Sequence, residues 1–196
     1  ECRLHRITYV GELGFEIYIP YNNLEKVFDV VYAKNGKSPV KLAGYHALNS
    51  LRMEKGYLHW GHDIGVEENP FEAGVGFCVN LNKKNPFLGQ AALEKKKKSG
   101  LSKRKVNFAL SNNDLLIYHN EPIYFDGKIV GEISSGMYGF YLDKSLGMGY
   151  ISNNDSYSIE EMMSHQKFEI EVAETKYSAE GSINCFYDPG REKILV

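Results

Sequence analysis

The second half of the chain consists of short segments with the composition of β-strands, and this pattern constrains the fold more than any other feature. Asp126 and Gly127 form a tight-turn signal between two of these segments. A series of short strands at close spacing predicts a small antiparallel barrel or sandwich. The segments, which are rich in β-branched and aromatic residues, are 106–110, 121–125, 128–133, 147–151, 167–172 and 177–183.

The first half has a different pattern, in which two strands precede a helix. Residues 4–10 and 14–20 have strand composition, and residues 11–14 are expected to form the hairpin loop between them. Asn22 and Glu25 have the spacing of a capping box at the start of the helix. One face of that helix is apolar and is formed by Leu24, Val27, Phe28 and Val31.

Glycines mark the ends of two expected helices. Asn35 and Gly36 end the first helix, and Gly56 ends a second one that runs from about residue 43 to residue 55. Strands followed by helices suggest an α+β unit.

The segment between the second helix and the first barrel strand is rich in glycine and proline. Residues 61–90 are expected to be mostly loop, with a strand near 76–81 and a short helix over 91–98. Because the pattern changes near residues 99–104, we place a domain boundary there. The expected domains are an α+β domain, residues 1–98, and a β domain, residues 103–196.

Composition excludes several classes of protein. The formal net charge of −2 gives no overall basic field, and no apolar run has the length of a membrane span, so we expect neither nucleic acid nor a membrane as a partner. The lysine run at 95–98 is interpreted as a solvated helix end, with a polyanion contact as the alternative.

The three cysteines, Cys2, Cys78 and Cys185, lie far apart and include no CxxC pair, which predicts a reducing compartment and no disulfide framework. We expect the cytoplasm, or the mitochondrial matrix if the source is eukaryotic. Because the sequence begins within a strand pattern and without Met, we expect that it has lost a natural N-terminal part.

The hairpin carries the residue pair with the clearest binding chemistry. If the loop is residues 11–14, Tyr9 pairs with Glu16 and their Cβ atoms lie roughly 5 Å apart on one face. A carboxylate can accept two parallel hydrogen bonds from the N3–H and 2-amino group of a pterin, and a tyrosine ring can pack on the bicycle. The alternative is an ordinary strand tyrosine beside an exposed glutamate.

A polar stretch follows the second helix and includes Tyr57, His59, His62 and Asp63. The His-x-x-His spacing occurs too often by chance to indicate a metal site, and no third ligand cluster supports one. A His–Asp pair could act as general acid and base, but no activated nucleophile accompanies it. We therefore interpret these residues as groups that cap the helix and order the loop.

Nucleotide-binding motifs are absent from the sequence. Gly74 and Gly76 supply the first two glycines of a dinucleotide motif, but the third glycine and the following helix are missing, and there is no phosphate-binding loop. We expect that the chain does not bind FAD or NAD by itself.

Six ordered blocks resemble the folate domain of dimethylglycine and sarcosine dehydrogenases, which is similar to the glycine-cleavage aminomethyltransferase. The resemblance implies a ferredoxin-like α+β subdomain beside a folate cleft, followed by a C-terminal antiparallel β-barrel. The α+β part is incomplete and corresponds to residues 1–98, and the barrel corresponds to residues 103–196. The blocks span residues 9–20, 43–64, 70–79, 87–93, 126–151 and 186–192.

The resemblance also implies roles for individual residues. Tyr9 and Glu16 match the hairpin residues that contact the pterin, and Tyr57 matches the tyrosine near the folate after the long helix. An arginine that binds the glutamate tail of folate in the glycine-cleavage branch is replaced by Leu48. Arg52 lies one turn further along and could take over that contact, although a structural ion pair is the alternative. The family's catalytic aspartate lies upstream of the hairpin motif, so we assign no catalytic residue.

The function implied by the resemblance is the C-terminal part of a module that transfers a one-carbon unit to tetrahydrofolate during demethylation of N-methylglycines. FAD would belong only to an upstream domain. The alternatives are a regulatory or interaction module that retains the fold, and an aminomethyltransferase that works without flavin. A truncated α+β face would also favour self-association.

Overall fold

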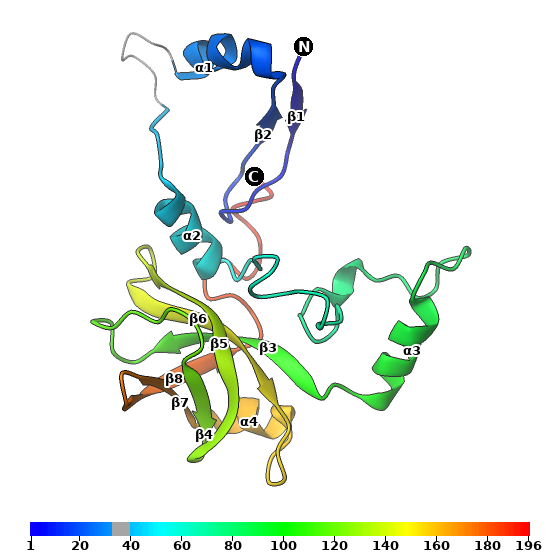
Figure 1. Ribbon diagram of the computed structural model, residues 1–196, viewed down its shortest axis with the longest axis vertical. Helices are drawn as coiled ribbons and strands as arrows, with labels where there is room; N and C mark the ends of the chain where they lie inside the picture. Colours follow the sequence, from blue (N-terminus) through cyan, green and yellow to red (C-terminus); the bar gives the residue numbers. More distant parts are fainter. Residues whose placement is uncertain (33–39) are drawn as a thin grey trace.

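The computed structural model describes residues 1–32 and 40–196, and it consists of a closed β-barrel from which two arms extend (Figure 1). One arm holds the N-terminal hairpin and the first helix, and the other holds helix α3. The C-terminal tail runs from the barrel back to the hairpin loop, where the Leu13 N–H donates to the carbonyl oxygen of Lys193 at 3.1 Å. The fold is α+β, as predicted, with an antiparallel barrel in the C-terminal half.

The barrel contains six antiparallel strands that close in the order β3-β6-β5-β4-β7-β8. All six segments predicted as strands are strands. Asp126 and Gly127 both have positive φ, 49° and 78°, as a two-residue hairpin turn of type I′ requires. The strands are β3 (Lys103–Leu110), β4 (Pro122–Phe125), β5 (Lys128–Gly139), β6 (Lys144–Ser152), β7 (Phe168–Val172) and β8 (Thr175–Ser182).

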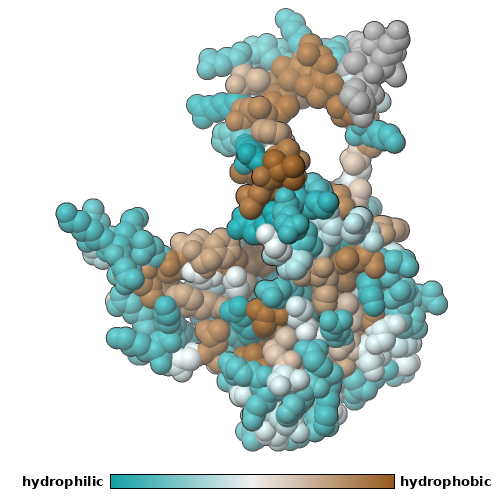
Figure 2. Space-filling model, turned by 180° about the vertical axis from the view of Figure 1, so that it is seen from behind, coloured by the Kyte–Doolittle hydropathy of each residue, from teal (hydrophilic) through white to brown (hydrophobic). Residues whose placement is uncertain are grey.

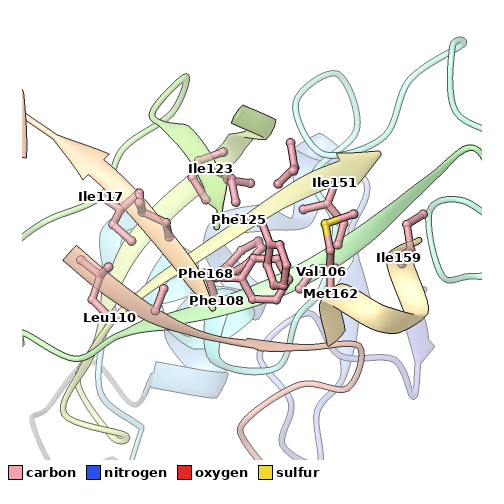
Figure 3. Close-up of a cluster of buried hydrophobic side chains, with 14 residues drawn as sticks. Val106, Phe108, Leu110, Ile117, Ile123, Phe125, Ile151, Ile159, Met162 and Phe168 are labelled. Atoms are coloured by element: carbon pink, nitrogen blue, oxygen red, sulfur yellow. The ribbon is translucent and has the colours of Figure 1, made fainter. Parts of the chain in front are cut away.

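The barrel interior is a closely packed apolar core. Phe108, Phe125 and Phe168 meet edge to face at its centre, with ring centroids 5.1–5.4 Å apart (Figure 3). Helix α4 (Ile159–His165) closes one end by burying Met162, and Ser158 and Glu161 form a capping box at its start. Burial of one such large apolar side chain stabilises a fold by about 1.5–3 kcal/mol, so the barrel supplies most of the chain's stabilising contacts.

Helix α2 (Tyr45–Glu54) packs against strands β5 and β6 on the outside of the barrel. Met53 is buried there with Leu146 and Met148 in a second apolar cluster. The Ser50 hydroxyl donates to the carbonyl oxygen of Tyr138 at 2.7 Å. The helix predicted over residues 43–55 is therefore confirmed, and the outer face of these strands is covered.

The N-terminal arm differs from its predicted form in detail. Strands β1 (Arg3–His5) and β2 (Glu16–Tyr18) have only three residues each, and helix α1 (Leu24–Tyr32) follows a 3₁₀ turn, η1 (Tyr21–Asn23). Asn22 lies inside that turn, so the predicted capping box, which needs Asn22 in front of the helix, is wrong. Asn35 and Gly36 lie outside the described residues.

The segment before the barrel is mostly loop, as predicted, but the strand expected near residues 76–81 is wrong. The chain forms a 3₁₀ turn, η2 (Gly76–Cys78), in which the Cys78 N–H donates to the Val75 carbonyl oxygen at 3.1 Å. A Cβ atom at Gly76 would lie 2.8 Å from the ring of Phe71, so close packing favours the turn there. The short helix predicted over 91–98 is confirmed as α3 (Gln90–Ser99). Among the described helices, none has the length and apolar character needed to cross a bilayer.

Candidate functional site

The hairpin does not have the register predicted from its sequence. His5 pairs with Glu16, and Tyr9 lies in a ten-residue loop, residues 6–15, outside the paired strands. The prediction that Tyr9 faces Glu16 across the hairpin is therefore wrong. The reason is tertiary, because Arg6 and Leu13 bind the C-terminal tail and hold the wide loop open. The Glu16 carboxylate is exposed and accepts a hydrogen bond from the Tyr18 hydroxyl at 2.8 Å.

The wide loop instead brings Tyr9 to Tyr57 at the end of α2. The two rings are nearly parallel, at 9°, with centroids 6.0 Å apart. The Tyr9 hydroxyl donates to the carbonyl oxygen of Leu58 at 2.9 Å, and burial raises the pKa of Tyr9. Both tyrosines line a cavity of about 730 Å³, which falls in the range of small-molecule sites.

Glycine at position 11 allows the loop to approach the end of α2. Gly11 has a φ of 79°, and a Cβ atom there would lie 2.9 Å from the side chain of Lys55. Lys55 is buried and forms an ion pair with Asp188 of the C-terminal tail at 2.8 Å. The hairpin loop, the helix end and the tail are thus packed against one another at one edge of the cavity.

A second link between the loop and the tail joins Glu12 to Tyr187. The Tyr187 hydroxyl donates to the Glu12 carboxylate, and this hydrogen bond together with desolvation raises the pKa of Tyr187 to about 12. The Tyr187 N–H donates to the Glu54 carbonyl oxygen at 3.1 Å. Hydrogen bonds therefore join the hairpin loop and the end of α2 to the C-terminal tail.

Arg52 belongs to a buried ion pair and not to the cavity that holds Tyr9 and Tyr57. Its guanidinium lies 2.7 Å from the carboxylate of Asp63, and both side chains are almost fully buried. It also donates to the carbonyl oxygen of Tyr57 at 3.2 Å and to the Ser135 hydroxyl at 3.1 Å. The structure therefore supports the ion-pair interpretation of Arg52 over a contact with a folate tail.

The polar stretch after α2 orders its own loop. Asp63 accepts hydrogen bonds from the His59 N–H at 2.8 Å and from the Ser134 hydroxyl at 2.6 Å. The rings of His59 and His62 stack with centroids 4.7 Å apart. Over residues 1–32 and 40–196, no three His, Cys, Asp or Glu side chains are grouped so that they could hold a metal ion.

Two further residues, Lys105 and Asn107, line the same cavity from strand β3 and were not predicted as site residues. The strand alternates, so Val106, Phe108 and Leu110 enter the barrel core while Lys105 and Asn107 point outward. An outward lysine is normally solvated, but here the loop after α2 and the C-terminal tail cover it, and Lys105 is only 6% exposed. The sequence of the strand alone could not have predicted that other segments bury Lys105.

The fold and site define an α+β chain with a closed six-stranded barrel, whose outer face forms one wall of a ligand-sized cavity. A family model described as the GCVT N-terminal domain matches residues 1–83, and one described as the glycine cleavage T-protein C-terminal barrel domain matches residues 103–188. The chain belongs to the glycine cleavage T-protein family.

Relatives with known names include oxidases and dehydrogenases. The 4-methylaminobutanoate oxidase (formaldehyde-forming) of Paenarthrobacter nicotinovorans is 36% identical over 96% of this chain and 22% of its own length. The mitochondrial sarcosine dehydrogenase of Homo sapiens is 32% identical over 98% of this chain and 21% of its own length. The chain thus spans about a fifth of the length of these relatives.

A solved structure has the same fold. The glycine cleavage system aminomethyltransferase T from Bartonella henselae matches with a TM-score of 0.77 and 23% sequence identity, over 97% of this chain and 50% of that one.

Proposed function

We propose that this chain forms part of a tetrahydrofolate site in a protein that transfers a one-carbon unit released from an N-methylated glycine. The observation that carries the proposal is the cavity of about 730 Å³ in which two parallel tyrosine rings lie beside hydrogen-bonding side chains. Membership of the glycine cleavage T-protein family supports it. The relatives named as a sarcosine dehydrogenase and a formaldehyde-forming oxidase support the N-methylated donor.

The spacing of the two rings limits how a flat ligand could bind. Atoms in contact prefer a separation of about 3.5–4 Å, so a ring held between two others needs about 7–8 Å between them. The centroids of Tyr9 and Tyr57 are 6.0 Å apart, which leaves no room for a third ring. We expect the pterin to pack on the cavity face of the pair and not between its members.

Glu16 is proposed to bind the pterin from outside the cavity that holds the two tyrosines. It does not line the cavity, and its carboxylate is exposed. Its role as the acceptor for the pterin N3–H and 2-amino group rests on the family resemblance, since the hairpin register gives it no support. An ionised carboxylate has about four acceptor positions on its two oxygens, so the hydrogen bond from Tyr18 to Oε2 does not by itself prevent a bidentate contact.

The chain's own residues in this proposal bind and orient the folate. Tyr9 and Tyr57 form the apolar wall, and the Arg52–Asp63 pair fixes the loop that carries Tyr57. Oxidation of the methylated amine needs a flavin, which we do not assign to this chain because it has no dinucleotide motif. The proposed compartment is the cytoplasm, or the mitochondrial matrix in a eukaryote.

Calorimetric titration with folinic acid tests the proposal, using the complete gene product that contains this chain. Tyr57→Ala should weaken binding by at least tenfold because the ligand loses its stacking surface, whereas Tyr141→Ala, outside the cavity, should leave it unchanged. Glu16→Ala should weaken binding if its carboxylate accepts from the pterin. Absence of folinic acid binding to the wild-type protein would disprove the proposal.

A regulatory or interaction module is the second candidate, and the observation that favours it is Leu48. The resemblance places the arginine for the folate tail at this position, and leucine cannot bind a carboxylate. The ion pair between Arg52 and Asp63 supports a structural role for Arg52 in place of a tail contact. A protein that binds no folate and changes the activity of a partner enzyme would support this candidate.

A further inference from the structure

The cavity is lined by a buried amine, that of Lys105, which has no role in the proposed function. Lys105 is 6% exposed, and its Nζ lies 2.9 Å from the Asn107 Oδ1 and 3.9 Å from the Met148 Sδ. Within the part of the chain that the structure describes, no carboxylate lies within ion-pair distance of this amine. An ammonium group has three N–H donors, so one oxygen acceptor leaves it incompletely satisfied.

Asn107 is fixed in the orientation that serves Lys105. Its Nδ2 lies 2.9–3.4 Å from the three successive backbone carbonyl oxygens of residues 182–184, at the end of β8, so the amide nitrogen must face them and the amide oxygen must face the amine. Gly56 allows this arrangement, because a Cβ atom there would lie 3.1 Å from Asn107 Oδ1. A fixed acceptor, the Asn107 amide oxygen, therefore binds the amine at the cavity wall.

All the charged side chains that line the cavity are cationic. Lys55, Lys105 and Arg191 line it, and none of its lining residues is an aspartate or glutamate. Lys55 is neutralised by Asp188, but Lys105 and Arg191 form no ion pair with any described carboxylate. The carboxylate that acts on Lys105 from a distance, Asp63, is already bound by Arg52. A cavity with unneutralised cations favours an anionic ligand.

A purely structural role does not account for this lysine. Burial disfavours the charged form of Lys105 and lowers its pKa to about 8. An apolar side chain of similar length at this position would avoid that cost. A buried cation without a carboxylate partner fits a site whose partner arrives with the ligand.

We propose that Lys105 is a ligand-binding residue that pairs with a carboxylate of a small aromatic or heteroaromatic acid in this cavity. The proposal rests on the proposed function insofar as the acid is a folate, for which the carboxylates are those of the glutamate tail. Lys105 would then supply the tail contact that position 48 lacks, while the tyrosine pair packs on the ring system. The pterin edge, which donates hydrogen bonds, is disfavoured beside this cation.

The test compares three probes on the complete gene product by calorimetry at pH 7. Folinic acid carries both pterin and carboxylates, p-aminobenzoylglutamate carries only the carboxylate half, and 6,7-dimethyltetrahydropterin carries only the ring. Lys105→Met should weaken folinic acid and p-aminobenzoylglutamate by at least tenfold and change dimethyltetrahydropterin by less than twofold. Lys98→Met, which removes the same charge from the exposed end of α3, is the matched control and should change none of them.

A proton readout separates ligand pairing from a structural effect. Carboxylate binding should raise the pKa of Lys105, so wild-type binding at pH 8.5 should take up protons, seen as a heat that depends on the buffer. The other titratable or charged groups that act on Lys105 are Asp63, Cys185 and Arg104. They remain in Lys105→Met, so proton uptake should disappear in that variant. Lys105→Gln serves as the second variant if Lys105→Met does not fold.

The outcomes distinguish this proposal from the proposed function. If folinic acid binds wild type and Lys105→Met equally, the lysine proposal fails and the folate site stands. If p-aminobenzoylglutamate binds through Lys105 but folinic acid does not bind, the folate proposal fails and the anion site stands. Loss of dimethyltetrahydropterin binding in Lys105→Met, or no binding of either carboxylate probe to the wild-type protein, overturns the lysine proposal.

Discussion

The barrel and the N-terminal arm contain strands of similar composition but differ in what those strands bury. Every residue of β3 from Lys105 to Leu110 is buried, because the barrel core covers one face and the cavity-forming segments cover the other. No residue of β1, β2 or α1 is buried, and Leu4, Leu24 and Phe28 are about half exposed. Figure 2 shows this apolar surface gathered over the arm. The comparison teaches that a strand-like sequence predicts a strand, but its neighbours decide how much stability it contributes.

The largest expected loss of stability comes from removing a buried side chain of the barrel, and the matching change in the arm should cost much less. Phe108→Ala should lower the free energy of unfolding by about 3–5 kcal/mol, because it leaves a cavity in the barrel core. Phe28→Ala on α1 should cost less than about 1 kcal/mol, since its side chain is already half exposed. Denaturant unfolding followed by circular dichroism measures both. Equal losses would show that the arm is packed as firmly as the barrel.

The second largest effect is expected at the buried ion pair that joins α2 to the loop that follows it. Asp63→Asn leaves the Arg52 cation buried without a partner and should cost about 3 kcal/mol or more. Asp126→Asn removes one partner of the exposed pair with Lys167, and we expect a change within about 1 kcal/mol. Thermal unfolding of the two variants gives the comparison, and a small effect at Asp63 would show that the loop is not held by this pair.

Lys105 gives a prediction about pH. Its folded pKa of about 8 is lower than its value in an unfolded chain, so between pH 8 and about 10.4 the unfolded chain binds more protons. The penalty for burying the charge is therefore fully present below pH 8 and is lost as pH rises toward 10.4. Without ligand, Lys105→Met should be more stable than wild type by at most ~3 kcal/mol at pH 7. Unfolding at a series of pH values should show this gain shrinking above pH 8, and a constant gain would contradict the assigned pKa.

The smallest expected difference between a variant and its control concerns the hairpin loop at the boundary of the two regions. Gly11→Ala places a Cβ atom at positive φ and 2.9 Å from Lys55, and should cost about 2–3 kcal/mol. Gly61→Ala is the control, because Gly61 also has positive φ but nothing lies within 4 Å of a Cβ atom there, so only about 1 kcal/mol is expected. Equal costs in calorimetry would mean that the loop moves away from α2 without loss.

The sequence identified individual candidate site residues, but it did not predict which of them lie together, because that depends on contacts between distant segments. Tyr9 was chosen together with Glu16, and Tyr57 was chosen separately from the family resemblance; the structure places the two tyrosines together in one cavity. The geometry used to select Tyr9 with Glu16 was wrong, since Glu16 pairs with His5. The binding roles of all three remain predictions. Arg52 was weighed between two roles, and its contacts with Asp63 support the structural one.

The sequence by itself determined the elements whose signals are local. The six barrel strands, the turn at Asp126 and Gly127, and the three predicted helices α1, α2 and α3 follow from periodicity and from residues that stop or turn the chain. These signals depend on neighbours a few positions away, so no knowledge of the fold is needed to see them.

Only the tertiary structure decided the hairpin register, the 3₁₀ turn at Gly76 and the burial of Lys105. The register depends on Leu13 meeting Lys193, and the burial of an outward lysine depends on segments before and after β3 that cover it. Such contacts join residues up to 190 positions apart in the chain. Their geometry is set by packing between elements, which the local alternation of side chains does not encode.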